Sequence, residues 1–284
     1  MHLLQGSGKA CNLEWKMHDV ISRPASRATC LARAGHLEVR VADRPQEVDE
    51  ALRLRHRVFA GEFGARLSDS HGPSDCDAGA QAVDRDVFDA HCRHLIAVDT
   101  GSGRVVGTYR VLLPEQARQL GFLYADREFH LSWLNPIRHD LVEMGRACIE
   151  PRYRNGVVLM MLWRAMRELV ACHGHQYVIG CCSVTLRDGG VTAARLYRQL
   201  AADHLAPPNQ RVWPRNRLPI EALAGRHMAQ EVEVPPLLRG YLRAGARILG
   251  EPHVDPQFGC ADFPILLEVS ALAPRLTARL AQGV

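Results

Sequence analysis

LVEMGRACIEPRYRNGVVLMMLW, residues 141–163, is the stretch that decides the fold, because it predicts a buried strand, a basic turn and a buried helix in succession. Strand side chains alternate between the faces of a sheet, so Glu143 and Arg146 should point to opposite sides unless the pleat is broken. Gly145 lies between them, and a glycine within a strand commonly marks a bulge that re-aims a neighbouring side chain and frees a backbone N–H. The stretch predicts either a catalytic strand whose freed N–H serves an oxyanion, or a core strand and helix joined by a solvated turn.

The turn within this stretch is basic and opens onto the helix. Arg152 and Arg154 follow Pro151, and Gly156 precedes an apolar run whose few charges share one helical face. Such a helix is mostly buried, and its N-terminus attracts anions through free backbone N–H groups. We expect an anion to bind near this turn, and ordinary solvated arginines are the alternative.

Composition predicts a soluble, globular protein. The chain has 284 residues, of which 47% are hydrophobic and 23% charged, enough for one large domain or two small ones. Its longest apolar run, Val157–Trp163, is far shorter than the roughly 18 residues of a membrane span, so we expect any membrane contact to be peripheral. The first 35 residues are basic but lack the apolar segment of a signal peptide, which predicts a mobile tail or a mis-set start codon in a cytoplasmic protein.

The cysteines predict reduced thiols in the core. There are nine of them and none forms a C-x-x-C pair, so neither a disulfide framework nor a zinc site is indicated. His91-Cys92, Cys172-His173 and His175 look metal-like locally, but no second pair stands at ligand spacing. We expect no metal site.

Charge is unevenly distributed along the chain. The net charge of +4 is too small to imply nucleic-acid binding. Acidic residues predominate between Glu62 and Asp99, and arginines predominate between residues 205 and 250. One region could hold a cationic group while the other faces an acidic partner, or the two could neutralise each other across the fold.

The rest of the chain alternates strands and helices around the central stretch. The strand after the central helix should be parallel to the central strand and joined to it by a right-handed crossover. A helix should begin at Pro45 and break before Gly64, and the acidic, glycine-rich segment 65–90 predicts a long functional or mobile loop. The other expected elements are strands at 37–41, 94–98, 105–113, 177–184 and 263–269 and helices at 193–202 and 236–249.

Arg110 is a charge within a strand that is otherwise rich in valine and leucine. A buried arginine needs a carboxylate partner, and Asp86 or Asp89 on the acidic segment is the natural candidate. Arg55 and Phe59, four residues apart, lie on one face of the expected first helix.

Three motifs carry a resemblance to a known family. They are Arg55-His56-Arg57-Val58-Phe59, Asp86-Val87-Phe88-Asp89 leading into His94-Leu95-Ile96, and Val106-Gly107-Thr108-Tyr109-Arg110 followed by Glu143-x-x-Arg146. With the order of elements, they resemble the Gcn5-related N-acetyltransferases (GNAT), in the branch of acyl-homoserine-lactone synthases and ornithine-acyl-carrier-protein N-acyltransferases. Ala65, where the lactone synthases have tryptophan, favours the ornithine, haemolysin-like group, as do the motifs at 235–243 and 255–263.

The resemblance implies an α/β fold with a mixed sheet and a C-terminal extension. We expect a basic, disordered leader over residues 1–36, a GNAT-like core over 37–206 and an extension over 207–284 packed on that core. The standard cofactor signature of the fold is not present: Tyr153–Val158 has its first glycine in register but tyrosine and valine at other key places. This departure argues against acetyl-CoA as the donor.

The implied reaction is transfer of a 3-hydroxyacyl chain from acyl carrier protein to the α-amine of L-ornithine, giving lyso-ornithine lipid. Amide formation from a thioester needs a neutral amine, an aligned attack and stabilisation of an oxyanion. Glu143, directly or through a water, is the candidate base, and the backbone near Gly145 to Ala147 is the candidate oxyanion donor. Arg146 joins this catalytic group, with a structural salt bridge to a loop aspartate as the alternative.

Two further groups of residues and several partners follow from the resemblance. The expected substrate-binding residues are Arg55, Phe59, Asp86, Asp89 and Arg110, and the two arginines are expected to pair with the two aspartates. The expected donor-binding residues, placed to meet the phosphate of a phosphopantetheine arm, are Arg152, Arg154, Asn155 and Gly156. We expect no tightly bound cofactor. Acyl carrier protein, L-ornithine and the inner face of the cytoplasmic membrane are the expected partners.

Other functions fit the same residues. One is an N-acyltransferase for another amino acid, or a signal synthase of the acyl-homoserine-lactone type. A third, non-enzymatic possibility is a lipid-binding module at the membrane surface, because the C-terminal arginines and Trp213 are suited to anionic lipid.

Overall fold

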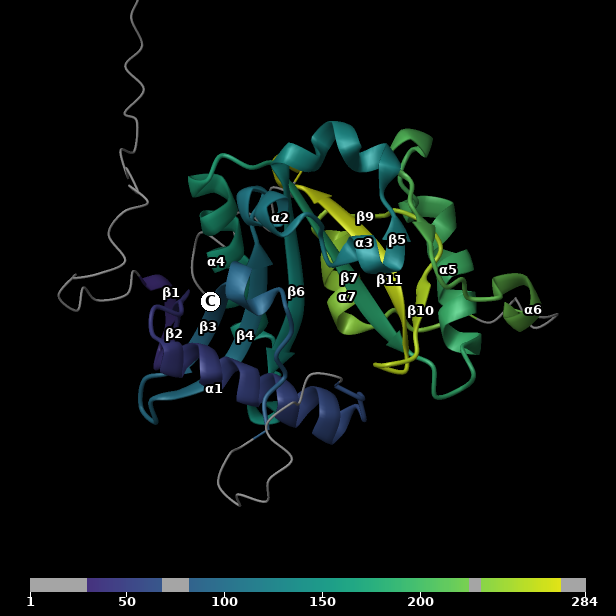
Figure 1. Cartoon of the computed structure of the whole chain (residues 1–284). Coiled ribbons are helices and arrows are strands. Elements are labelled where there is room, and N and C mark those ends of the chain that lie inside the picture. The colour runs from purple at the N-terminus through teal and green to yellow at the C-terminus, as the bar shows by residue number, and fades with distance from the viewer. Residues whose placement is uncertain (1–29, 68–81, 225–230, 272–284) are drawn as a thin grey trace, which may run out of the picture.

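The computed structural model describes residues 30–67, 82–224 and 231–271 (Figure 1). At its centre lies a nine-stranded mixed sheet in the order β1-β2-β3-β4-β6-β7-β11-β10, with β9 also paired to β11. The strands are β1 (Cys30–Ala34), β2 (Leu37–Val41), β3 (Arg93–Asp99), β4 (Arg104–Leu112), β6 (Leu141–Ile149), β7 (Tyr177–Thr185), β9 (Arg247–Ile248), β10 (His253–Asp255) and β11 (Cys260–Glu268). A two-stranded sheet joins β5 (Phe129–His130) to β8 (Trp213–Pro214).

The first half of the sheet is covered by helices on both faces. Ile96 of β3 packs in a cluster with Leu54 of α1, whereas its neighbour Leu95 belongs to the cluster that contains Leu162 of α4. Because successive strand residues point to opposite faces, α1 and α4 lie on opposite sides, and Figure 1 shows α1 crossing in front of β3 and β4. The helices are α1 (Pro45–His56), α2 (Pro114–Leu120), α3 (Ala125–Glu128), α4 (Val157–Cys172), α5 (Val191–His204), α6 (Ile220–Ala224) and α7 (Pro236–Arg243).

Most of the expected elements are present. The strand expected at 37–41 is β2, those at 94–98 and 105–113 correspond to β3 and β4, and the last strand corresponds to β11. The central stretch forms β6 and α4, and β7 runs parallel to β6 as predicted. The expected break in the first helix is confirmed, because α1 is followed by a π-helical segment, Arg57–Glu62.

Two predicted boundaries are wrong. The leader was expected to reach residue 36, but Cys30–Ala34 form β1, which pairs with β2. The rest of that leader, residues 1–29, lies outside the described residues. The helix expected at 236–249 ends at Arg243, because Gly245 takes a left-handed φ of 100° and the chain then enters β9. Of the loop expected at 65–90, residues 68–81 also lie outside the described residues.

The C-terminal part of the chain contributes an interior strand, β11, between β7 and the edge strand β10. β11 pairs with β7 along its whole length, from Cys260 opposite Thr185 to Glu268 opposite Tyr177. Its Phe263 is fully buried in the main core. We predicted an extension packed on the core, whereas this strand is part of the core sheet. The domain boundary at residue 206 stays a prediction.

β6 and β7 pair over only part of their length. Their parallel ladder runs from Leu141 opposite Tyr177 to Met144 opposite Gly180. A Cβ on residue 180 would stand 2.7 Å from the carbonyl oxygen of Met144, so only glycine permits this close approach. Beyond it the two strands separate, as Figure 1 shows, and the separation opens the sheet beside the second half of β6.

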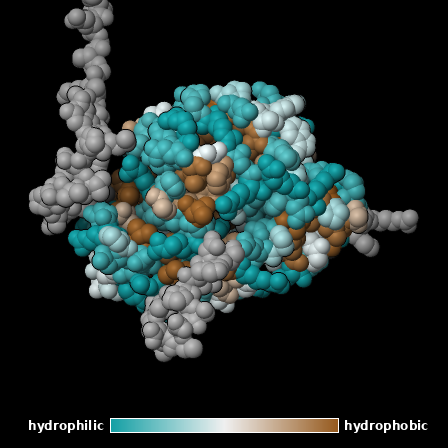
Figure 2. All heavy atoms as spheres, in the orientation of Figure 1, coloured by the Kyte–Doolittle hydropathy of each residue, from teal (hydrophilic) through white to brown (hydrophobic). Residues whose placement is uncertain are grey.

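The surface is mostly hydrophilic on the face drawn in Figure 2, with hydrophobic residues gathered in patches between the polar ones. Within the described ranges, none of the helices combines the length and apolar character that crossing a membrane requires.

Candidate active site

A cavity of about 590 Å³ opens where β6 and β7 separate. Its wall includes Glu143 and Arg146 of β6, Ser183 of β7, Asp255 of β10 and Asp262 of β11. Aromatic surface comes from Phe59, Phe63, Phe88, Tyr124 and Phe258. A concave site of this size, mostly apolar with a few polar groups, is typical of small-molecule binding. The cavity is therefore the candidate active site.

A bulge in β6 brings two of the predicted catalytic residues into this cavity. Arg110 of β4 lies opposite Gly145 and Thr108 lies opposite Cys148, so two β6 residues, Arg146 and Ala147, face one residue of β4. Among the described residues other than glycine, only Arg146 has a positive φ, 55°. The predicted bulge is thus confirmed, but its distorted residue is Arg146, one position after the glycine. It breaks the alternation, so that Arg146 lines the same cavity as Glu143.

Glu143 is a buried carboxylate held by two backbone donors. The N–H groups of Tyr124 and Ala125 donate to its two oxygens at 2.6 Å and 2.7 Å. Burial raises its pKa to about 7, although these two hydrogen bonds act in the opposite direction. We predicted a raised pKa from partial desolvation, and the structure confirms it. A carboxylate with this pKa can accept a proton near neutral pH.

Four of the predicted substrate-binding residues form one ion-pair network. Arg55, which is fully buried, donates to Asp89 at 2.7 Å and to Asp84 at 2.7 Å. Arg110 donates to Asp86 at 2.6 Å and to Asp89 at 3.1 Å. Burial raises the pKa of Asp89, but the charges of Arg55 and Arg110 outweigh it and hold that pKa below its ordinary value. The predicted pairing of arginines with aspartates is confirmed, and Asp84 is a member that the sequence did not indicate.

Arg146 joins the edge of this network and faces aromatic rings. It donates to Asp86 at 3.3 Å, and its Nε lies 3.4 Å from Asp84. Its guanidinium lies 4.7 Å from the ring centre of Phe258 and 5.2 Å from that of Tyr124, within cation–π range. The alternative that Arg146 pairs with a loop aspartate is therefore confirmed, and its catalytic role stays a prediction.

Phe59 lines the cavity and packs edge to face against Phe258, with ring centres 5.8 Å apart. Phe258 lies in the turn between β10 and β11, which the sequence separates from Phe59 by most of the chain. The contact places the first motif beside the C-terminal motif on one wall.

The four predicted donor-binding residues do not line the cavity. Arg154 donates to Glu62 at 2.8 Å and 2.9 Å, and the Asn155 Oδ1 accepts a bond from the Val157 N–H at the start of α4. Gly156 precedes this helix with a left-handed φ of 92°, and Arg152 is exposed. Their role in donor binding stays a prediction, and Arg154 would have to exchange Glu62 for a phosphate.

Three acids near the cavity were not among the predicted site residues. Asp255 and Asp262 line it, and Glu128 accepts a hydrogen bond from the thiol of Cys181, another lining residue, at 3.3 Å. Burial raises the pKa of Asp262 to about 6 and that of Glu128 well above its ordinary value. The motif at 255–263 contains Asp255 and Asp262 and was used only for the family resemblance, and it gave no indication of their partners.

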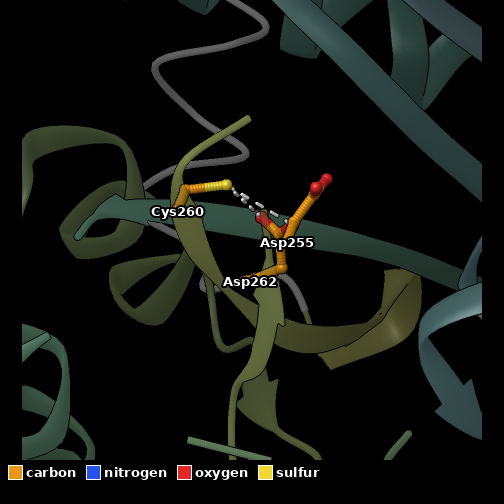
Figure 3. Close-up of side chains that lie close together, drawn as sticks. All are labelled: Asp255, Cys260 and Asp262. Carbon is orange, nitrogen blue, oxygen red and sulfur yellow. Dashed lines mark hydrogen bonds between the residues drawn. The ribbon is translucent and has the colours of Figure 1, made fainter. Parts of the chain in front are cut away.

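Figure 3 shows Asp255, Cys260 and Asp262 at the turn between β10 and β11. One ligand atom from each lies within 4.8 Å of the others, a spacing that a metal ion could bridge. However, burial raises the pKa of the Cys260 thiol, and the thiol donates weakly to Asp262. Without a metal ion, the group is therefore a pair of carboxylates beside a neutral thiol donor.

Comparison with known proteins places the chain in a family. Residues 54–164 match the model described as the acetyltransferase (GNAT) domain. The L-ornithine N(alpha)-acyltransferase of Brucella abortus (strain 2308) is 33% identical over 264 residues, which cover 87% of this chain and 90% of the relative. The chain belongs to the L-ornithine N(alpha)-acyltransferase family.

Other members of the L-ornithine N(alpha)-acyltransferase family are similarly related. The one from Rhizobium meliloti (strain 1021) is 30% identical over 304 residues, which cover 97% of this chain and 94% of the relative. Among solved structures, the AHL synthase LasI shares 13% identity with a TM-score of 0.47, over 88% of this chain and 98% of that one. The predicted GNAT-like fold and N-acyltransferase class are thereby confirmed for this family member.

Proposed function

We propose that the protein transfers an acyl chain from a thioester to the α-amine of L-ornithine. In its fuller form, the proposal is transfer of a 3-hydroxyacyl chain from acyl carrier protein, giving lyso-ornithine lipid. The acceptor is the one in the relatives' names. The observation that carries the proposal is Glu143, a buried carboxylate with a pKa of about 7 on the wall of the cavity where β6 and β7 separate.

The reaction needs a neutral amine in contact with the thioester carbonyl. In our scheme, Glu143 takes one proton from the α-ammonium, and the amine nitrogen then attacks the carbonyl carbon. Backbone N–H groups at the Arg146–Ala147 bulge stabilise the tetrahedral oxyanion. The carbon–nitrogen bond forms first, giving the tetrahedral intermediate. The nitrogen then loses its second proton to solvent, the carbon–sulfur bond breaks, and the leaving thiolate receives the proton held by Glu143. The amide and the free thiol are the products.

A smaller, apolar cavity of about 40 Å³ lies beside the large one, with room for no more than the end of an acyl chain. The two cavities share Met144, Gly180 and Cys181. Its other walls include Trp163 and Met166 of α4 and Ile265 of β11. Burial of a hydrocarbon tail against such side chains is favourable by about 0.8 kcal/mol for each CH₂ group.

The proposed donor is the carrier-bound thioester. Carrier proteins are acidic, and Arg187 is an exposed cation that lines the mouth of the cavity. Arg152 is a second exposed cation, on the turn before α4. Complementary charge of this kind speeds association of partner proteins. Acyl-coenzyme A is the competing donor.

Contact with a membrane surface is a further part of the proposal. Trp133 and Trp213 are each nearly half exposed, at 47% and 46%, and pack edge to face with ring centres 5.2 Å apart. Tryptophan is enriched at membrane–water interfaces. Sedimentation with anionic vesicles should decrease in the double variant Trp133→Ser/Trp213→Ser, and unchanged sedimentation would remove this contact.

Acceptor competition tests the proposed function. Purified protein is given acyl carrier protein thioester with equimolar labelled ornithine, lysine, glutamine, glycine and S-adenosylmethionine, and the acylated products are identified by mass spectrometry. We expect acylornithine to predominate. Predominance of another amide, or of a lactone, would assign the protein to one of the alternative acceptors, and vesicle binding without thioester consumption would favour a lipid-binding module.

A further inference from the structure

Two of the acids on the cavity wall have no basic partner within the described ranges. Asp255 and Asp262 are 8% and 4% exposed, so both are more than nine-tenths buried. Asp262 accepts only neutral donors, the Ser183 hydroxyl at 2.5 Å and the weak thiol of Cys260. Glu128, 4% exposed, is close enough for the charge of Asp262 to act on it, and it forms no ion pair with any described residue.

One oxygen of Asp255 has no hydrogen-bond donor in the described part of the chain. The backbone N–H groups of Gln257 and Phe258 donate to its Oδ1, at 2.7 Å and 3.1 Å. No donor is present for its Oδ2, although the side chain lines the cavity. Because this oxygen belongs to a side chain that lines the cavity, it is available to accept a hydrogen bond from a bound ligand.

The acids of the network around Arg55, which do not line the cavity, are different, because the fold itself supplies their cationic partners. Asp84, Asp86 and Asp89 are matched by Arg55, Arg110 and Arg146. Arg146, whose charge opposes the effect of burial on the pKa of Asp262, is itself held by Asp84 and Asp86. Asp255 and Asp262 on the cavity wall are therefore the acids that lack a paired cation among the described residues.

We propose that Asp255 and Asp262 bind the side-chain ammonium group of the acceptor and so select a diamino acid. This rests on the proposed function. An ammonium has three N–H donors, and ligand atoms of the two carboxylates lie within 4.8 Å of each other, close enough for one –NH₃⁺ to bind both. With the side-chain ammonium held here, the α-amine is left to reach Glu143, which lines the same cavity.

The test compares L-ornithine with L-norvaline, which has the same carbon skeleton without the side-chain amine. For the wild type, kcat/KM should be greater for ornithine by roughly 10²-fold, because a buried charge pair is lost with norvaline. In Asp262→Asn and in Asp255→Asn, kcat/KM for ornithine should fall toward the norvaline value, while kcat/KM for norvaline should stay within a few fold. Asp49→Asn, on the surface, should behave as the wild type.

Three outcomes would overturn the inference. If Asp255→Asn and Asp262→Asn lowered kcat/KM equally for ornithine and norvaline, the two acids would have a structural role. A wild type with the same kcat/KM for both amino acids would also contradict the inference. Loss of ornithine use on adding a chelator, with recovery on adding a divalent cation, would make the pair a metal site. Ornithine should raise the melting temperature of the wild type but not of Asp262→Asn, which shows binding even if turnover is low. If instead the wild type acylated no amino acid, the proposed function itself would fail.

Discussion

The Oε2 of Glu143 accepts the backbone N–H of Tyr124 at 2.6 Å, and the Ala125 N–H occupies its other oxygen at 2.7 Å. These bonds fix the carboxylate at the cavity wall. They also show that it has a structural task, because it satisfies two donors at the start of α3. A test of its catalytic task must therefore be separated from its effect on folding.

The first prediction concerns the dependence of the wild-type rate on pH. Glu143 can accept a proton only when it is unprotonated, and burial raises its pKa to about 7. The kcat for amide formation should therefore rise with pH through about 7 and fall about tenfold for each unit below it. The measurement is kcat at saturating substrates between pH 5.5 and 8.5. A flat profile across that range would indicate that another group, or none, accepts the proton.

The second prediction concerns folding of Glu143→Gln. Its amide NH₂ would face one of the two backbone N–H donors, so one hydrogen bond is lost and two donors oppose each other. We expect a loss of about 1–3 kcal/mol in the free energy of unfolding at pH 8. Urea denaturation measures it, with Glu115→Gln, on the exposed surface of α2, as the control. An unchanged stability would mean that the carboxylate does not hold these donors.

The third prediction concerns the network around Arg55. Asp89→Asn leaves Arg55 and Arg110 poorly compensated in a buried site, which typically costs about 3–5 kcal/mol. Asp49→Asn, which removes an exposed pair with Arg85, should cost at most about 1 kcal/mol. Because the pKa of Asp89 is depressed in the folded state, its contribution should be present at neutral pH and lost as the pH falls below roughly 4. A normal melting temperature with weaker ornithine binding would show that Asp89 serves the substrate only.

The fourth prediction concerns the donor. If acyl carrier protein binds at the basic mouth of the cavity, kcat/KM should fall as salt is added, because exposed charges are screened within roughly 8–10 Å at physiological ionic strength. Arg187→Glu should lower kcat/KM with the carrier thioester but leave an uncharged acyl thioester unaffected. Arg118→Glu, exposed on α2, is the matched control. Equal rates with acyl-coenzyme A and no salt effect would remove the carrier protein from the account.

Local patterns in the sequence account for what could be predicted. The hydrophobic periodicity of the sequence predicted β2, β3, β4, β6 and α4. The charge of Arg110 within an apolar strand predicted carboxylate partners, and Asp86 and Asp89 are those partners in the structure. The bulge was signalled by Gly145, but the strained residue is its neighbour. These features depend on residues close in sequence or on a charge that has to be compensated.

What could not be predicted depends on contacts between distant segments. Asp262 lies beside Ser183 only because β11 pairs with β7, and no local pattern specifies that pairing. The sequence predicted that Arg154 binds a phosphate. In the structure it donates to the carboxylate of Glu62, at the end of the π-helical segment that follows α1. Asp255 and Asp262 were not predicted for the same reason. They are more than a hundred positions from Glu143 in the sequence and share a cavity with it only in the folded chain.

The most direct test of the account is the rate of acylornithine formation by the wild type and by Glu143→Gln, from carrier thioester and L-ornithine at pH 7 and a temperature where both are folded. The account predicts that the wild type forms the α-amide and that the variant is slower by roughly 10²–10⁴-fold, the usual contribution of a general base. Raising the pH should partly restore the variant, because solution then supplies the neutral amine. A folded variant with the wild-type rate at pH 7 would contradict the account.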